Sequence, residues 1–182
     1  MGYPCETCIL LCTGELNRNK NQTVVIKAFS EVVKSRTDVK LLLAGNGPME
    51  DELKRLAKGL CIENNVDFLG YRTDLEKFVQ ISDVIVSASL REGLGLNIVE
   101  AMMCGKPVVA SFNRGHRELV REGETGFLFN PADTILLAGR ISLLASDSAM
   151  RNTMGMSAIQ SSMPYRSDTV ANEIKEIYGL NA

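Results

Sequence analysis

Short, continuous apolar runs alternate along this chain with longer segments of helical periodicity, and this alternation is the strongest constraint on its fold. The runs predict strands at residues 8–12, 39–44, 66–69, 84–86, 106–111 and 127–129. Strands that lack polar alternation are buried on both faces, which requires a parallel sheet covered by helices on both sides. The sequence therefore predicts an α/β fold with a doubly wound, mostly parallel sheet, and a ligand site at the carboxyl ends of its strands.

The segments between the predicted strands carry apolar side chains at the spacing of a buried helix face. Helices are predicted over residues 21–35, around 53–60, over 74–80 and 96–105, in a short segment ending at 119–120, from 130 onward, and over 148–160 and 167–178. In the fourth helix, Leu96, Val99 and Met103 are expected to form the buried face. No internal repeat, low-complexity segment or linker interrupts the pattern, so residues 1–182 are predicted to form a single Rossmann-like domain.

The helix that follows the last predicted strand has a clear start signal. Asn130 is the expected N-cap, Pro131 the first helical residue and Asp133 an acid of the first turn. Each residue type is favoured at its position. The signal predicts a long amphipathic helix from about residue 131.

The composition of the chain limits the classes of function. A net charge of −2 gives no electrostatic reason to bind nucleic acid or an anionic membrane surface. No apolar run approaches the ~20 residues that cross a bilayer, and the first residues lack the basic region of a signal peptide. The cysteines are odd in number, five, which indicates reduced thiols and a cytoplasmic location.

Cys5 and Cys8 form a C-x-x-C motif, which is typical of a redox pair or of half a zinc site. No second C-x-x-C and no histidine pair supplies further ligands, so no metal site is predicted. Cys12 and Cys104 are expected to be small, buried apolar side chains.

The stretch Ser89–Pro107 lies between two predicted strands and opens with a glycine-spaced loop before it turns helical. The backbone N–H groups of residues 93–96 are expected to lack intrahelical partners, and the helix dipole favours an anion there. Glu92 in the loop and Glu100 about one turn into the helix would face the same crevice. Carboxylates beside an anion site suit a ligand with both phosphates and hydroxyls, such as a sugar nucleotide.

The same stretch resembles the signature of the group 1 retaining glycosyltransferases of the GT-B type. The family pattern is matched at Ser89, Glu92, Gly93, Gly95, Glu100, Ala101, Met102, Gly105, Pro107, Val108 and Ala110. The resemblance runs from about Leu10 to the C-terminus and covers only the C-terminal, donor-binding half of such an enzyme. It implies an N-terminal acceptor-binding domain, absent from this chain, on the other side of the active-site cleft.

The resemblance also implies residue roles. Glu92 would contact hydroxyls of the donor sugar, Lys20 would neutralise the diphosphate leaving group, and Glu100 would bind the ribose. The other implied donor-binding residues are Gly93, Leu94, Gly95, Leu96, Arg18, Gly14, Gly70 and Tyr71, with the phosphates held by backbone N–H groups and the base contacted by the main chain. The family has an arginine where this chain has Glu15, so Arg18 is the expected substitute cation.

Other motif residues are expected to line the site rather than to react. Gly45–Pro48 matches a glycine–proline turn of the family. His116, the only histidine, is expected to lie in a loop where it lines the cleft or faces solvent, and Glu118 to stabilise its short helix. The sequence contains no Asp-x-Asp, so donor binding without a metal or other cofactor is expected, with UDP-sugar favoured over GDP-sugar.

For the whole protein, the resemblance implies sugar transfer from a nucleotide-sugar to a glycan or lipid-linked acceptor. Capsule, exopolysaccharide or other cell-surface glycan synthesis would be the setting, in the cytoplasm or peripherally at the inner face of the membrane. The isolated domain would be inactive. A GT-B-fold nucleotide-sugar epimerase and a non-catalytic nucleotide-sugar-binding module remain alternatives. A dinucleotide-dependent dehydrogenase fits the fold but not residues 14–20, where one glycine stands instead of three.

Overall fold

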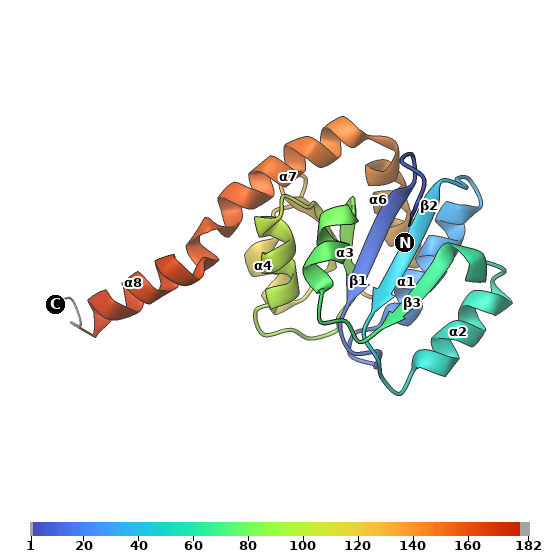
Figure 1. Cartoon of the computed structure of the whole chain (residues 1–182), viewed down its shortest axis with the longest axis horizontal. Helices are drawn as coiled ribbons and strands as arrows, with labels where there is room; N and C mark the ends of the chain where they lie inside the picture. Colours follow the sequence, from blue (N-terminus) through green and yellow to red (C-terminus); the bar gives the residue numbers. More distant parts are fainter. Residues whose placement is uncertain (1, 179–182) are drawn as a thin grey trace.

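Six parallel strands form one sheet in the computed structural model, which describes residues 2–178 (Figure 1). The strands are β1 (Cys8–Thr13), β2 (Val39–Ala44), β3 (Val66–Gly70), β4 (Val84–Ser87), β5 (Val108–Ser111) and β6 (Gly126–Phe129). The α-helices are α1 (Gln22–Val33), α2 (Glu50–Gly59), α3 (Leu75–Ile81), α4 (Leu96–Met103), α5 (Arg114–Leu119), α6 (Thr134–Ser146), α7 (Ser148–Ser162) and α8 (Ser167–Ile177), and short 3₁₀ helices cover Glu63–Asn65 and Met163–Tyr165. The predicted parallel α/β sheet is confirmed.

The strand order β3-β2-β1-β4-β5-β6 places the topological switch point between β1 and β4. The chain builds outward from β1 toward β3 and then from β4 toward β6, so the loops after β1 and β4 lead to opposite faces of the sheet. Parallel α/β proteins bind ligands in the crevice at such a point. The two loops touch here, because the N–H of Leu90 donates to the carbonyl of Asn19 at 2.7 Å.

Every residue of β1 is buried, and successive side chains enter two different cores. Leu10 and Cys12 belong to the core beneath α1, α2 and α6. Ile9 and Leu11 belong to the core beneath α3, α4 and α5, on the other face of the sheet. Because side chains of a strand alternate between faces, this two-sided cover explains why the strands read as continuous apolar runs.

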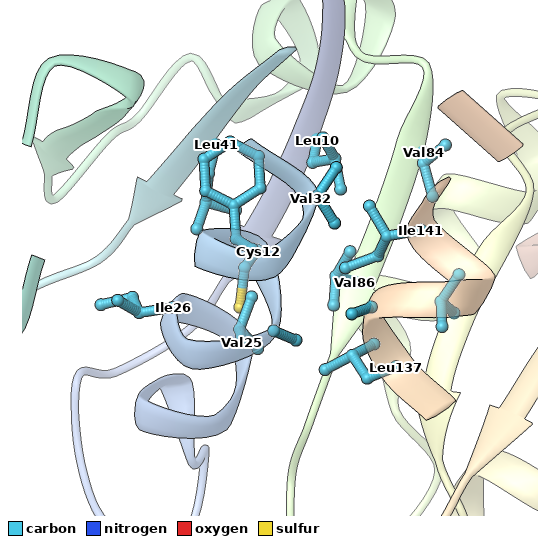
Figure 2. Close-up of a cluster of buried hydrophobic side chains, with 14 of the residues drawn as sticks. Leu10, Cys12, Val25, Ile26, Val32, Leu41, Val84, Val86, Leu137 and Ile141 are labelled. Carbon is cyan, nitrogen blue, oxygen red and sulfur yellow. The ribbon is translucent and has the colours of Figure 1, made fainter. Parts of the chain in front are cut away.

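Figure 2 shows the core between the sheet and helices α1 and α6. Side chains of three strands meet those of both helices in it: Leu10, Leu41, Val84, Val86, Val25, Val32, Leu137 and Ile141. All of them are at most 1% exposed. Full burial of one such side chain contributes about 1.5–3 kcal/mol, so this packing fixes the strands whose carboxyl ends carry the loops.

Helix α4 turns a different face to the sheet from the one that its periodicity predicts. Leu96 is 66% exposed and Met103 is only partly buried, whereas Ile98 and Met102 are buried. Of the predicted face, only Val99 is buried, so that prediction is wrong for the other two residues. Six of the eight side chains of this helix are apolar, so several of its faces could be buried and the pattern alone does not fix its rotation.

Helix α6 begins at Thr134, later than the sequence predicts, and the prediction of Asn130 as its N-cap is wrong. Asp133 is the cap, and its carboxylate accepts a hydrogen bond from Leu136 N–H at 2.8 Å. The side-chain oxygen of Asn130 instead accepts from Ala132 N–H at 3.1 Å in a local turn. Both residue types cap helices and form such turns, so local chemistry did not distinguish them.

The last helices lead away from the sheet. Helix α7 packs against α4 and α6, while α8 extends from the body and has no buried residue (Figure 1). Within residues 2–178, no helix is long and apolar enough to cross a membrane. That part of the chain also contains no group of three or more histidine, cysteine, aspartate or glutamate side chains able to hold a metal ion.

The cysteines divide between core and surface. Cys12 is buried as predicted, but Cys104 is exposed and that prediction is wrong. Cys8 is buried in β1, and its motif partner Cys5 is exposed. Burial raises the pKa of the Cys8 thiol to about 11 and that of Cys12 to about 12, which leaves both as inert thiols at neutral pH.

Candidate functional site

Two adjoining cavities open at the carboxyl edge of the sheet. The switch-point cavity has a volume of about 490 Å³ and is lined by Thr13, Gly14, Lys20, Leu75, Glu92, Leu94, Gly95, Leu96 and Asn97. The β2–β3 cavity has a volume of about 470 Å³ and is lined by Gly14, Glu15, Ala44, Gly45, Asn46, Gly47, Tyr71, Arg72 and Leu75. Gly14 and Leu75 border both cavities, so an elongated ligand can extend from one into the other.

Lys20 and Glu92 form an ion pair across the switch-point cavity, with Lys20 Nζ 2.5 Å from Glu92 Oε1. The two side chains are 24% and 15% exposed. The loop holds Lys20 in place, because its backbone N–H donates to Asn17 Oδ1 at 2.9 Å. The pair joins residues 72 positions apart, and it brings a cation and an anion to the wall of one cavity.

The pKa of Glu92 lies below its ordinary value. Burial alone would raise this pKa, but the hydrogen bond and the charge of Lys20 outweigh burial and stabilise the carboxylate. Glu92 is therefore ionised at neutral pH and can only accept hydrogen bonds. It can accept them from ligand hydroxyls, while the ammonium of Lys20 can donate to an anionic group.

The loop before α4 presents a row of unpartnered backbone donors. Within the described residues, no N–H from Glu92 to Asn97 donates to a protein acceptor. Gly95 is the N-cap of α4 with φ of 79°, in the left-handed region that glycine enters without strain, and no side chain caps the helix. The unpartnered N–H groups and the positive end of the helix dipole make this loop an anion site.

The β2–β3 cavity has a mixed wall. Tyr71 is 75% exposed there, and Arg72 is held by a two-point contact with Asp74, at 2.9 Å for both hydrogen bonds. The loops after β2 and β3 are tied together, since Gly45 N–H donates to Gly70 O at 2.8 Å. This wall offers a planar ring, an arginine and exposed main chain to a ligand.

Glu15, which stands where the family has an arginine, lines the β2–β3 cavity rather than the switch-point cavity. Its side-chain Oε2 accepts from Asn17 Nδ2 at 2.8 Å. The acid is thus held by its own loop and does not pair with Lys20, whose partner is Glu92.

The structure brings most of the predicted site residues together. Glu92, Lys20, Gly14, Leu94, Gly95 and Leu96 line the switch-point cavity, and Tyr71 lines its neighbour. Gly93, Gly70, Arg18 and Glu100 border neither cavity. Arg18 and Glu100 are exposed, and Glu100 lies one turn beyond Leu96 on α4. Arg18 lies in the same loop as Lys20, but it does not line the cavity that Lys20 lines.

Sequence reasoning missed three residues of the switch-point cavity: Thr13, Leu75 and Asn97. Asn97 Nδ2 donates to Thr13 Oγ1 at 3.2 Å and so links α4 to the end of β1. The position of Thr13 at the end of a predicted strand was the available signal, because strand ends carry ligand sites in this fold. Leu75 and Asn97 carried no such signal.

His116 is completely buried, at 0% exposure, so the prediction that it lines the cleft or faces solvent is wrong. It lies in α5, and its ring contacts polar groups at the ends of β4 and β5. Burial holds the pKa of His116 below its ordinary value. Glu118 is exposed and faces Arg114 one turn earlier, with 3.6 Å between charged atoms, an arrangement that supports a short helix weakly.

The fold and the site define a class: a Rossmann-like α/β domain with an anion-binding loop at its switch point. The chain belongs to the Glycosyl transferases group 1 family, whose model matches residues 4–161. The resemblance seen in the sequence is therefore confirmed at the level of the family.

Individual relatives agree with this membership. EpsD of Bacillus subtilis (strain 168) is 34% identical over 177 residues, which cover 97% of this chain and 46% of EpsD. The N-acetyl-alpha-D-glucosaminyl L-malate synthase of Bacillus anthracis is 32% identical over 171 residues, covering 93% of this chain and 45% of that enzyme. The chain thus spans about half the length of the curated relatives that it matches.

A solved structure shows the same architecture. HepE from Anabaena, in complex with UDP, has a TM-score of 0.86 and 31% identity over 96% of this chain and 49% of its own. HepE has also been solved with UDP-glucose, at a TM-score of 0.85 and 30% identity, covering 95% of this chain and 49% of its own.

Proposed function

We propose that this chain is the donor-binding domain of a retaining glycosyltransferase that uses a nucleotide-diphosphate sugar. The observation that carries the proposal is the row of unpartnered N–H groups from Glu92 to Asn97 beside the Lys20–Glu92 pair. A diphosphate would satisfy these donors and bring its negative charge to Lys20.

The donor sugar would lie near Glu92, whose ionised carboxylate accepts hydrogen bonds from hydroxyls. Glu100 would reach the ribose from the exposed face of α4, one turn past the anion-binding loop. Arg18, exposed in the same loop as Lys20, would add positive electrostatic potential near the switch-point cavity without lining it. Transfer would then rest on electrostatic stabilisation of an oxocarbenium-like sugar and of the leaving diphosphate.

The nucleoside would occupy the β2–β3 cavity, which adjoins the phosphate site at Gly14 and Leu75. Its volume of about 470 Å³ accommodates one nucleoside. Exposed main chain around Gly70 would read the base, and Tyr71 would cover it. UDP is the favoured nucleotide, supported by the HepE structures in complex with UDP and UDP-glucose.

The complete protein would carry an N-terminal GT-B domain that binds the acceptor. The chain is about half as long as its relatives, which supports a missing partner domain. The acceptor would be a glycan or a lipid-linked sugar in cell-surface polysaccharide synthesis, reached at the cytoplasmic face of the membrane. No metal or other cofactor is required by this proposal.

The test is calorimetric and thermal-shift titration of this chain with UDP, GDP, ADP and their sugar conjugates, without added metal. A ligand at 100 times its dissociation constant should stabilise the fold by about 2.7 kcal/mol. We expect UDP compounds to bind most tightly. Glu100→Ala should weaken UDP by about tenfold through loss of the ribose contact.

The matched control is Glu31→Ala, which removes an exposed helical glutamate of α1 that pairs only with Lys34. It should leave the UDP affinity unchanged. Absence of binding by every nucleotide would refute donor binding by this chain. Equal affinities for UDP in Glu100→Ala and the wild type would refute the ribose assignment alone.

A second function is nucleotide-sugar binding without turnover. It is favoured for this chain by itself, because the chain would supply only one of the two walls of a GT-B active-site cleft. Release of UDP from UDP-glucose in the presence of this chain measures turnover. Turnover by the isolated domain would contradict the simpler binding role.

A further inference from the structure

His116 is a polar, titratable side chain enclosed in the interior, in a place that an apolar residue could fill. It is 0% exposed and lies in α5, between the ends of β4 and β5. A buried imidazole costs free energy unless its nitrogens are hydrogen-bonded. The hydrogen-bond partners of the His116 ring therefore show which parts of the chain this side chain holds in place.

The hydrogen-bond network assigns one neutral tautomer to the ring. His116 Nδ1 lies 2.8 Å from the carbonyl oxygen of Ser111, which can only accept, so Nδ1 carries the proton. His116 Nε2 lies 3.3 Å from Ser87 Oγ, and the hydroxyl donates to it. The ring thus links the last residue of β4 to the last residue of β5.

The same network reaches the start of the anion-binding loop, residues 89–95. Ser111 Oγ donates to the carbonyl of Ser89 at 2.5 Å, and Asn113 Nδ2 donates to the same carbonyl at 2.8 Å. The amide of Asn113 is oriented by the main chain of α5, because the backbone N–H of His116 donates to Asn113 Oδ1 at 3.0 Å. Two of the three side chains around His116 therefore hold Ser89.

The far end of the loop rests against the same turn. A Cβ on Gly115 would lie 2.6 Å from Gly93 O and 3.0 Å from Glu92 O, so the loop backbone approaches α5 too closely for any side chain there. A Cβ on Gly95 would meet the His116 ring carbon Cδ2 at 3.5 Å. The segment Asn113–His116 is thus the wall behind the loop.

On its other side, the main chain of the loop is hydrogen-bonded only at its beginning, and the ion pair with Lys20 holds the side chain of Glu92. Asn19 accepts from Leu90 N–H at 2.7 Å and exchanges side-chain hydrogen bonds with the main chain of Arg91 at 3.1 and 3.2 Å. From Glu92 to Gly95, no described backbone N–H has a protein partner. The position of these donors therefore depends on the wall behind them.

We propose that His116 is a positioning residue whose ring, through Ser111, holds the unpartnered donors of residues 92–95 in the geometry that a donor diphosphate requires. The inference rests on the proposed function for its consequence, but the effect on the loop can be measured without ligand. His116 takes no part in proton transfer in this role, since the buried ring does not reach either cavity.

The first experiment measures backbone order in the free protein by ¹⁵N relaxation, using the amides of Gly93, Leu94 and Gly95. His116→Phe fills the same space but removes both ring hydrogen bonds, and order parameters should fall from about 0.85 to below about 0.6. His116→Asn retains a donor in the place of Nδ1–H and should keep the loop ordered. Val39→Ala truncates a buried side chain at the amino end of β2, far from the loop, and controls for a general loss of stability.

The second experiment titrates the same four proteins with UDP at a temperature where all are folded. His116→Phe should weaken UDP by about tenfold or more, while the other two variants stay within about threefold of the wild type. Rescue by asparagine separates positioning from simple core packing, because asparagine fills the space less well than phenylalanine does.

Each outcome bears on the proposal. Wild-type loop order and UDP affinity in His116→Phe would overturn it, and so would a loop equally disordered in His116→Asn. If the wild type does not bind UDP but His116→Phe disorders the loop, the positioning role stands and the proposed donor function falls.

Discussion

Replacement of Lys20 by methionine tests the electrostatic centre of the site. Lys20→Met keeps the unbranched stem, which lies over Gly14, and removes only the charge and its donors. A hydrogen bond to a charged group contributes about 1.5–3 kcal/mol. In the free protein, Lys20 already donates to Glu92 at 2.5 Å, so a phosphate must compete for it. We therefore expect the low end of that range, about 1.5–2 kcal/mol, which weakens UDP by roughly 10- to 30-fold.

Isothermal titration with UDP at two salt concentrations measures this effect. The affinity of the wild type should fall more steeply with salt than that of Lys20→Met, because salt screens the attraction between the partly exposed ammonium and the phosphates. Lys27→Met removes an exposed lysine of α1 away from both cavities and should bind UDP as the wild type does. Glu92→Gln should bind UDP at least as tightly as the wild type, since it removes the competing carboxylate.

The stability of Lys20→Met should also depend on pH. In the wild type, the pKa of Glu92 is lowered, so its ionised form contributes stability above the ordinary value of 4.5 and loses it as pH falls through the lowered pKa. Without Lys20, burial still raises this pKa while two of the influences that lower it are gone, so the variant gains less stability than the wild type as pH rises toward 7. The difference in unfolding free energy between the two proteins should therefore be larger at pH 7 than at pH 4. A constant difference across this range, or unchanged UDP affinity in Lys20→Met, would refute the reasoning.

Two further predictions concern backbone approach and thiol burial. Gly115→Ala adds a Cβ at 2.6 and 3.0 Å from carbonyl oxygens of the anion-binding loop, and calorimetry should show UDP weakened at least tenfold. Gly139→Ala, in an open position of α6, should stabilise the fold by about 0.5–1 kcal/mol without changing UDP affinity; equal affinities in the two variants would contradict the role of the close contact. In thiol labelling of the folded protein, Cys104 should react within minutes, whereas Cys8 and Cys12, whose pKa values burial raises to about 11 and about 12, should react only after denaturation. Rapid labelling of either buried thiol in the native state would mean that β1 is less well covered than the structure has it.

The sequence determined the elements and the nature of the loop before α4. Continuous apolar runs report burial on two faces, and that burial requires helices on both sides of a parallel sheet. The glycines around Leu94 and the helix that follows predict free backbone donors, because the first N–H groups of any α-helix lack partners within the helix. These features are local or periodic, so they could be predicted without coordinates.

Only the tertiary structure decided which faces and partners the side chains have. Leu96 is exposed and Cys104 reaches the surface, because the rotation of a mostly apolar helix is set by the elements that pack against it. Asp133 rather than Asn130 caps α6, and both residue types suit a cap, so only the folded backbone distinguishes them.

Long-range contacts were equally beyond local patterns. Lys20 and Glu92 meet across 72 residues, and His116 is enclosed beneath a loop that precedes it by more than 20 positions. Nothing in the sequence around His116 distinguishes a solvated histidine from a buried one. Strand order brings the ends of β4 and β5 together, and that proximity places His116 at the centre of a hydrogen-bond network.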